Sequence, residues 1–149
     1  MEFITHSPEE TEQIGYALAQ HLTPGAVLAF EGDLGAGKTT FIKALAGILM
    51  TDSGKITVDG KSVYDNENIK KKIAYVSDDL YFFPTYTIKQ TARFYSGIYE
   101  NWSWDEYNTM LKFFKADENK RCRRMSKGMQ KQAAIWMALC TKPEILILD

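Results

Sequence analysis

The chain has 149 residues, of which 45% are hydrophobic and 25% charged, a composition typical of a single soluble globular domain. Its formal net charge of −1 excludes a global field that would recruit nucleic acid, so we expect no direct nucleic-acid partner. No apolar run approaches the roughly 20 residues of a membrane helix, and Cys122 and Cys140 lack metal-type spacing. We therefore expect a reduced cytoplasmic protein without direct membrane insertion, held at a membrane only through a partner.

The first part of the chain predicts a strand, a helix and a second strand. Residues 2–5 are typical of a short strand. Ser7, Pro8 and Glu10 then supply three agreeing signals for the start of a helix, because a cap, a proline in the first turn and a capping box coincide. Residues 26–30 form an apolar run that is short enough for a buried strand.

A phosphate-binding P-loop motif, G-x-x-x-x-G-K-[ST], follows this run. Its glycines allow successive backbone N–H groups to converge on phosphate oxygens, and the helix that follows offers further N–H groups and its dipole. Lys38 is expected to reach the β- and γ-phosphates of a nucleotide, and Thr39 to place its hydroxyl on Mg²⁺. The expected phosphate cradle consists of Gly32, Asp33, Leu34, Gly35, Ala36, Gly37, Lys38, Thr39 and Thr40.

The middle of the chain predicts a helix, a hairpin and a strand. Residues 40–49 carry apolar side chains at helical spacing. Residues 55–64 alternate in polarity around Asp59 and Gly60, a dipeptide that is typical of tight hairpin turns. Residues 73–76 form an apolar strand, and Asp78 follows it.

The last part of the chain predicts helices and one further strand. Residues 87–118 are mostly helical and unusually aromatic, and these rings are expected either to fill the core of a helical subdomain or to face a partner protein. The basic residues 120–124 are expected to form a solvated loop. Residues 127–139 predict a helix, and residues 144–149 predict an apolar strand that ends in Asp149.

From about residue 37 to residue 149 the order and spacing of motifs resemble an ABC-type ATPase, the nucleotide-binding subunit of ABC transporters. The matching segments are residues 45–49 and 52–61 after the P-loop, residues 73–78 at the Q-loop strand, Met125-Ser126-Lys127-Gly128-Met129-Gln130 at the signature sequence, and residues 145–149 at the Walker B strand. Lys127 stands for the first glycine of the usual signature.

This resemblance implies roles for particular residues. Mg²⁺ is expected to be held by Thr39, Asp149 and Asp78. The signature residues Ser126, Lys127, Gly128 and Met129 are expected to contact the ATP bound by a second subunit. Asp78 is the one candidate for a catalytic role, but it stands where the Q-loop usually has glutamine. A carboxylate can bind Mg²⁺, yet it cannot also donate a hydrogen bond to water.

The front of the chain resembles a different family. Residues 4–11, 22–25 and 31–40 are similar to TsaE, the small ATPase of the bacterial machinery that makes threonylcarbamoyladenosine in tRNA. The sequence therefore predicts a chimera of natural or engineered origin, with residues 1–45 TsaE-like and residues 46–149 ABC-like.

We expect one α/β P-loop NTPase domain over residues 1–149: a mostly parallel sheet with flanking helices on both faces and a helical insertion near residues 84–125. The expected function is Mg-ATP binding with weak or no hydrolysis, because the catalytic glutamate and switch histidine of an ABC ATPase have no counterparts in these 149 residues. Two alternatives stay open, an engineered nucleotide-binding scaffold and a TsaE-like factor in tRNA modification. The expected partner is a transporter membrane subunit, and the expected oligomeric state is a monomer or weak dimer.

Overall fold

The computed structural model describes residues 26–29, 38–50 and 55–149. The chain divides into two compact units, Met1–Asp65 and Asn66–Asp149, and each is considered by itself. The strand expected at residues 2–5, the helix expected to start at Ser7 and the loop of residues 32–37 lie outside the described residues.

The helix predicted after the P-loop motif is confirmed as α2, Lys38–Leu45. Ile42 and Ala46 lie one turn apart and are both buried. The chain leaves the helix through Gly47, whose φ of 70° is in the left-handed region. Gly47 N–H donates to the carbonyl of Ala44, and Ile48 N–H donates to that of Lys43, both at 2.9 Å. This pair of bonds is a Schellman motif, so the glycine ends the helix and satisfies its last carbonyls.

The predicted hairpin is also confirmed, with strands shorter than expected. Strand β1, Thr57–Val58, pairs antiparallel with β2, Lys61–Ser62. Asp59 and Gly60 join them with φ angles of 52° and 71°. Positive φ at both central residues is the geometry of a type I′ turn, which matches the twist of the two strands and explains the Asp-Gly pair.

The strand predicted over residues 26–30 is wrong for the four residues that the structure describes. Residues 26–29 form no regular structure and all four are exposed, Val27 by 90%. An apolar run becomes a buried strand only when neighbouring strands satisfy its backbone groups. Among the described strands, none pairs with this run.

The second unit is built on two parallel strands whose predictions are confirmed. Strand β3, Ile73–Val76, lies beside β4, Ile145–Leu148, with Ile73 opposite Ile145 and Val76 opposite Leu148. The N–H of Asp149 donates to the carbonyl of Val76 at 3.0 Å and continues the ladder. Because the strands are parallel, residues that follow them in sequence, about 70 positions apart, meet at one edge.

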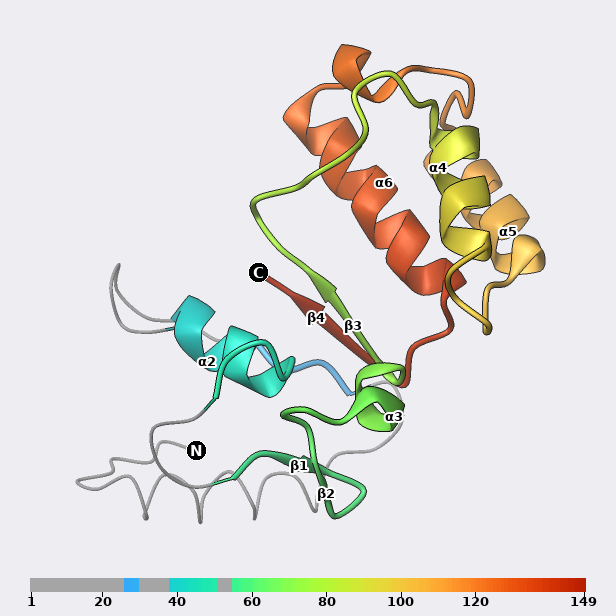
Figure 1. The fold of residues 1–149 in the computed structure, drawn as a ribbon. Helices are drawn as coiled ribbons and strands as arrows, with labels where there is room; N and C mark the ends of the chain where they lie inside the picture. The colour runs from blue at the N-terminus through green and yellow to red at the C-terminus, as the bar shows by residue number, and fades with distance from the viewer. Residues whose placement is uncertain (1–25, 30–37, 51–54) are drawn as a thin grey trace. The chain divides into compact units, whose positions relative to one another are not determined.

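The connection between these strands is helical, as residues 87–118 and 127–139 predict. A short helix α3, Glu67–Lys70, precedes β3, and the connection itself contains α4, Ile88–Ser96, α5, Trp104–Phe114, the 3-10 turn η1, Cys122–Arg124, and α6, Lys127–Cys140. Helix α6 packs on β3 and against α4 and α5, so the long helices α4–α6 cover one face of the strand pair (Figure 1).

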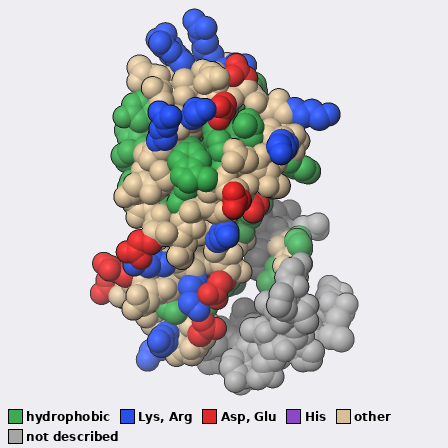
Figure 2. Space-filling model, turned by 90° about the vertical axis from the view of Figure 1, so that its right-hand side faces the viewer, with side chains coloured by type: hydrophobic (Ala, Val, Ile, Leu, Met, Phe, Trp, Pro, Cys, Tyr) green, Lys and Arg blue, Asp and Glu red, His purple; other side chains and the backbone are tan. Residues whose placement is uncertain are grey.

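The aromatic segment is partly buried and partly exposed, so the core interpretation is confirmed for some of its rings and the partner interpretation stays a prediction. Tyr107 is buried and stacks on Trp136 of α6 with ring centroids 4.6 Å apart, so part of the segment forms the core of the helical layer. Phe113, in contrast, is 72% exposed. Figure 2 shows such hydrophobic side chains reaching the surface of the helical part, below a group of Lys and Arg side chains. No helix of the described residues is long and apolar enough to cross a membrane.

Candidate functional site

The residues expected to bind phosphate are only partly described. Residues 32–37 lie outside the described chain, and Lys38 is the first residue of α2. Thr39 and Thr40 are exposed in the first turn of this helix. A helix therefore begins where the motif requires one, and its first turn has the unpaired N–H groups and the positive dipole end that suit phosphate. The cradle of residues 32–40 stays a prediction.

The carboxyl ends of β3 and β4 bring Tyr75 and Asp149 together. Tyr75 lies opposite Ile147 in the ladder, and Asp149 follows two residues later on the same face. The Tyr75 hydroxyl donates a hydrogen bond to Oδ2 of Asp149 at 2.8 Å. Burial, together with the Asp149 carboxylate, raises the pKa of Tyr75 above its ordinary value. The phenol therefore stays protonated at neutral pH and orients the carboxylate as a donor.

Lys131 of α6 reaches the same strand ends from the helical layer. Its Nζ donates to Oδ1 of Asp78 at 2.7 Å, to the carbonyl of Ser77 at 3.4 Å and to the main-chain oxygen of Asp149. The Lys131 side chain is 29% exposed, and that of Asp78 is 80% exposed. One ammonium group thus connects the helix that begins at the signature motif to the ends of both parallel strands.

The donor set at this edge fits a magnesium ion in part. Mg²⁺ prefers hard oxygen ligands and usually takes one or two carboxylates, with phosphate and water oxygens completing its shell. Asp149 supplies a carboxylate that Tyr75 orients, whereas an oxygen of Asp78 is engaged by Lys131. Among the described residues no three acidic, cysteine or histidine side chains gather as a metal cluster. Thr39 belongs to the other unit, so its role as a ligand stays a prediction.

The signature residues form the first turn of α6. Ser126 is the N-cap, and its Oγ accepts a hydrogen bond from the N–H of Met129 at 3.3 Å. Ser126, Lys127 and Gly128 are all exposed, and a Cβ added at Gly128 would meet nothing within 4 Å. The first turn of a 14-residue helix therefore presents unpaired N–H groups and a lysine to solvent, an arrangement that suits an anion.

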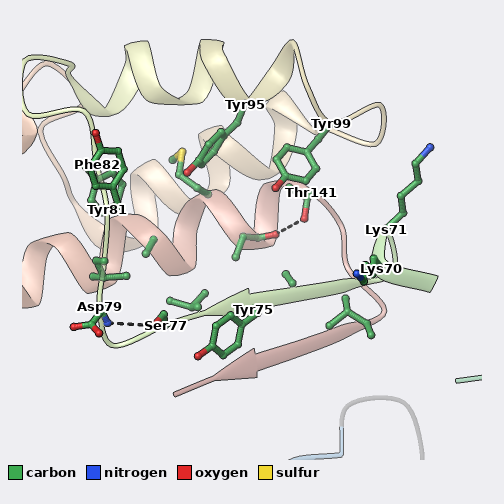
Figure 3. Close-up of a pocket in the computed structure, with 17 residues that line it drawn as sticks. Lys70, Lys71, Tyr75, Ser77, Asp79, Tyr81, Phe82, Tyr95, Tyr99 and Thr141 are labelled. Atoms are coloured by element: carbon green, nitrogen blue, oxygen red, sulfur yellow. Dashed lines mark hydrogen bonds between the residues drawn. The ribbon is translucent and has the colours of Figure 1, made fainter. Parts of the chain in front are cut away.

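A cavity of about 270 Å³ lies between β3 and the helices above it. Figure 3 shows Tyr95 of α4, Tyr99 of the segment after α4 and Thr141 facing the strand across this space, with Asp79 beyond the carboxyl end of the strand. The N–H of Asp79 donates to Oγ of Ser77 at 3.2 Å, which shapes the turn that leaves β3. Most of the cavity lining comes from residues 70–82, and Phe82, Tyr95 and Met137 also pack in the core of the helical layer.

Two residues of this site were not singled out from the sequence. Tyr75 lies inside an ordinary apolar strand, and nothing local indicates that its hydroxyl meets a carboxylate 74 positions away. Lys131 lies five residues after the cap of α6, where an exposed lysine is common. Only the parallel pairing of β3 with β4 and the packing of α6 on β3 bring these groups together.

The chain matches the ABC transporter family over residues 17–149. It is 28% identical over 125 residues to the ABC transporter ATP-binding protein YtrB of Bacillus subtilis, a match that covers 84% of this chain and 43% of that protein. It is 30% identical over 138 residues to the molybdenum import ATP-binding protein ModC of Salmonella choleraesuis, covering 89% of this chain and 39% of ModC. The chain thus spans about two fifths of the length of these curated relatives.

Solved structures have the same fold. A putative ABC transporter ATP-binding protein from Pyrococcus furiosus superposes with a TM-score of 0.70 at 22% identity, over 80% of this chain and 60% of that one. An ATP-binding subunit of an ABC transporter superposes with a TM-score of 0.68 at 25% identity, over 80% of this chain and 52% of that one. The expected α/β P-loop NTPase fold is confirmed by these neighbours.

Proposed function

Because the chain belongs to the ABC transporter family, we propose that it binds Mg-ATP as the ATP-binding part of a transporter. The observation that carries the proposal is that the parallel strands β3 and β4 end side by side, with the carboxylate of Asp149 directly after β4. There Tyr75 orients Asp149, and Lys131 connects the edge to the signature helix. A nucleotide-binding P-loop domain needs such a carboxylate at the end of a parallel strand.

In this proposal each segment has one task. Residues 32–40 surround the phosphates, Lys38 contacts the β- and γ-phosphates, and Thr39 and Asp149 hold Mg²⁺. The bound ion would neutralise charge between the phosphates. Tyr75 holds the Asp149 carboxylate in place from the next strand. Asp78 is the weaker metal ligand, because binding through its Oδ1 would have to displace Lys131.

The proposed partner is a membrane subunit, which places the protein at the cytoplasmic side of a membrane. Relatives named as import ATP-binding proteins, ModC among them, support this role. In a pair of such domains Ser126 and Gly128 would face the γ-phosphate bound by the second copy, and their exposure on α6 suits that contact. A monomer or weak dimer stays the expected state of the free chain, and light scattering with and without Mg-ATP measures it.

Titration calorimetry with Mg-ATP tests the binding proposal. Lys38→Ala is expected to lower affinity by about a hundredfold or more, because the lysine supplies a charge-assisted contact to phosphate. Lys43→Ala is the matched control: it removes the same charge from the same helix, and we expect its affinity to stay within about twofold of the parent. Equal affinities for the parent chain and Lys38→Ala would refute the assignment of the P-loop.

Two finer predictions from the sequence concern the rate of hydrolysis and the origin of the front of the chain. Slow hydrolysis is supported by Asp78, which has no amide N–H to help place an attacking water and is paired with Lys131. A TsaE-like front and a chimeric or engineered origin gain no support, since the family match begins at residue 17, inside the segment assigned to TsaE. Binding of the chain to the tRNA-modifying machinery, without a transporter partner, would revive that alternative.

A further inference from the structure

Positive charge is concentrated in one segment of the chain. Residues 112–132 contain eight of the 18 Lys and Arg residues but only two of the 19 acidic residues. This segment therefore carries a net charge of +6, while the rest of the chain carries −7. The net charge of the whole chain is close to zero, but this segment alone is strongly positive. A concentrated positive charge raises the local concentration of anions.

The structure folds part of this segment into a groove. The groove has a volume of about 810 Å³ and is formed by the end of α5, the loop after it, η1 and one side of α6. Its charged lining consists of Lys115, Lys120, Arg121, Arg124 and the single carboxylate of Asp117. Figure 2 shows Lys and Arg side chains gathered at one end of the helical part. In Figure 1 this end contains the loop after α5 and the start of α6.

The four cations of the groove differ from three lysines that lie elsewhere in the second unit. Lys72, Lys89 and Lys131 each form an ion pair with an acidic side chain. Among the residues that the structure describes, no such pair involves a groove cation. Within the described part of the chain, the Nζ of Lys120 donates to the sulfur of Met129 at 3.5 Å, and sulfur is a weak acceptor.

The one acidic side chain of the groove does not neutralise these cations. Oδ1 of Asp117 accepts a hydrogen bond from the N–H of Asn119 at 3.0 Å, which closes the turn after α5. The dipole of α5 accounts for a lysine at its C-terminal end, Lys115, whose φ is 48°. It does not account for Arg121 and Arg124, which follow that end by six and nine residues and line the same groove.

From this placement we infer that the groove binds a ligand with clustered phosphate groups, at a site separate from the P-loop. Arginine forks match phosphate oxygens in pairs, and Gln132 and Asn119 add neutral donors. The lining carries a net charge of +3, which two phosphate groups of about −1.5 to −2 each compensate. A single carboxylate would leave most of that charge unbalanced.

Two features separate this site from the nucleotide contacts already proposed. Neither Ser126 nor Gly128 lines the groove, although both lie in the adjoining turn of α6. The phosphates can come from a soluble polyphosphate compound or from the headgroups of an anionic lipid surface. Both sources present phosphate oxygens to the groove. A lipid phosphodiester carries a single negative charge, so several headgroups together would balance the lining, and the experiment distinguishes the two sources.

The test uses the full chain with Lys38→Ala, so that binding at the P-loop does not contribute. Pyrophosphate is titrated by calorimetry in one arm, and vesicles of phosphatidylglycerol or of neutral phosphatidylcholine are used in a flotation assay in the other. The double substitution Arg121→Gln and Arg124→Gln is expected to weaken binding by about tenfold or more, to pyrophosphate or to the anionic vesicles, whichever of the two the parent chain binds. Arg123→Gln is the matched control, because Arg123 lies between these residues, is exposed and does not line the groove.

Binding that the paired substitution weakens, and that Arg123→Gln leaves within about twofold, supports the site. The arm in which it occurs identifies the source of the phosphate. Circular dichroism checks the fold, and Lys115→Gln with Lys120→Gln serves as a second pair should the first unfold. Absence of binding in both arms would overturn the inference. An equal loss in Arg123→Gln would also overturn it, since the effect would then be one of net charge alone.

Discussion

Replacing Lys131 by methionine should destabilise the second unit more than replacing its partner Asp78 by asparagine. Lys131→Met keeps most of the apolar stem but removes an ammonium with three oxygen partners. The ion pair with the largely exposed Asp78 contributes about 0.2–1 kcal/mol. The two main-chain oxygens add about 1 kcal/mol together, because one contact is long at 3.4 Å. We therefore expect a loss of about 1–2 kcal/mol for Lys131→Met and about 0.5 kcal/mol for Asp78→Asn.

Urea unfolding followed by tryptophan fluorescence measures this difference directly. All three tryptophans, Trp102, Trp104 and Trp136, lie in residues 66–149, so the signal reports on the second unit alone. The double variant should show a coupling energy of about 0.2–1 kcal/mol that falls as salt is raised. Equal losses for the two single variants would refute the reasoning, because Lys131 would then act through Asp78 only and would not connect α6 to the strand ends.

Two further predictions concern the core of the helical layer. Trp136→Phe should cost about 2 kcal/mol, because it removes a buried hydrogen bond from Nε1 to the carbonyl of Tyr107 at 3.1 Å together with part of a buried ring. The half-exposed Trp104→Phe should cost less than about 0.5 kcal/mol, and a similar loss for both would contradict the assignment of the core. Stability should also fall in alkali, since burial raises the pKa of Cys140 to about 12 and that of Tyr107 above its ordinary range. The unfolded chain releases these protons from about pH 9 upward while the folded chain keeps them, so this stability is complete below pH 9 and is lost as pH rises toward 12. Unfolding free energies at pH 8 and 10.5 should differ less in Cys140→Ala than in the parent chain, and an equal difference would count against the buried thiol.

Sequence and structure each say something different about the two carboxylates at the carboxyl ends of β3 and β4. The resemblance to ABC-type ATPases predicts Asp149 and Asp78 as metal ligands from their places in the sequence. The structure adds that Asp78 is held by Lys131, while Asp149 accepts a hydrogen bond from Tyr75. Two carboxylates that look equivalent in the sequence therefore have different surroundings, and Asp149 is the better ligand in the proposal.

The sequence by itself determined the elements whose signals are local. Asp59 and Gly60 predict the hairpin because both adopt positive φ, which few other residues do without strain. Residues 127–139 predict the helix that becomes α6, and residues 73–76 and 144–149 predict strands from their apolar runs. Such features depend on a few neighbouring residues, so a linear pattern is sufficient to find them.

Only the tertiary structure decided which residues meet. The same kind of apolar run forms a strand at residues 73–76 but not at residues 26–29, because only the first has a described partner strand. The contact of Lys131 with Asp78 joins residues 53 positions apart, and the groove forms only where α5, η1 and α6 pack together. Hydrogen bonds and charges act over a few ångströms in space, whereas a sequence records only separation along the chain.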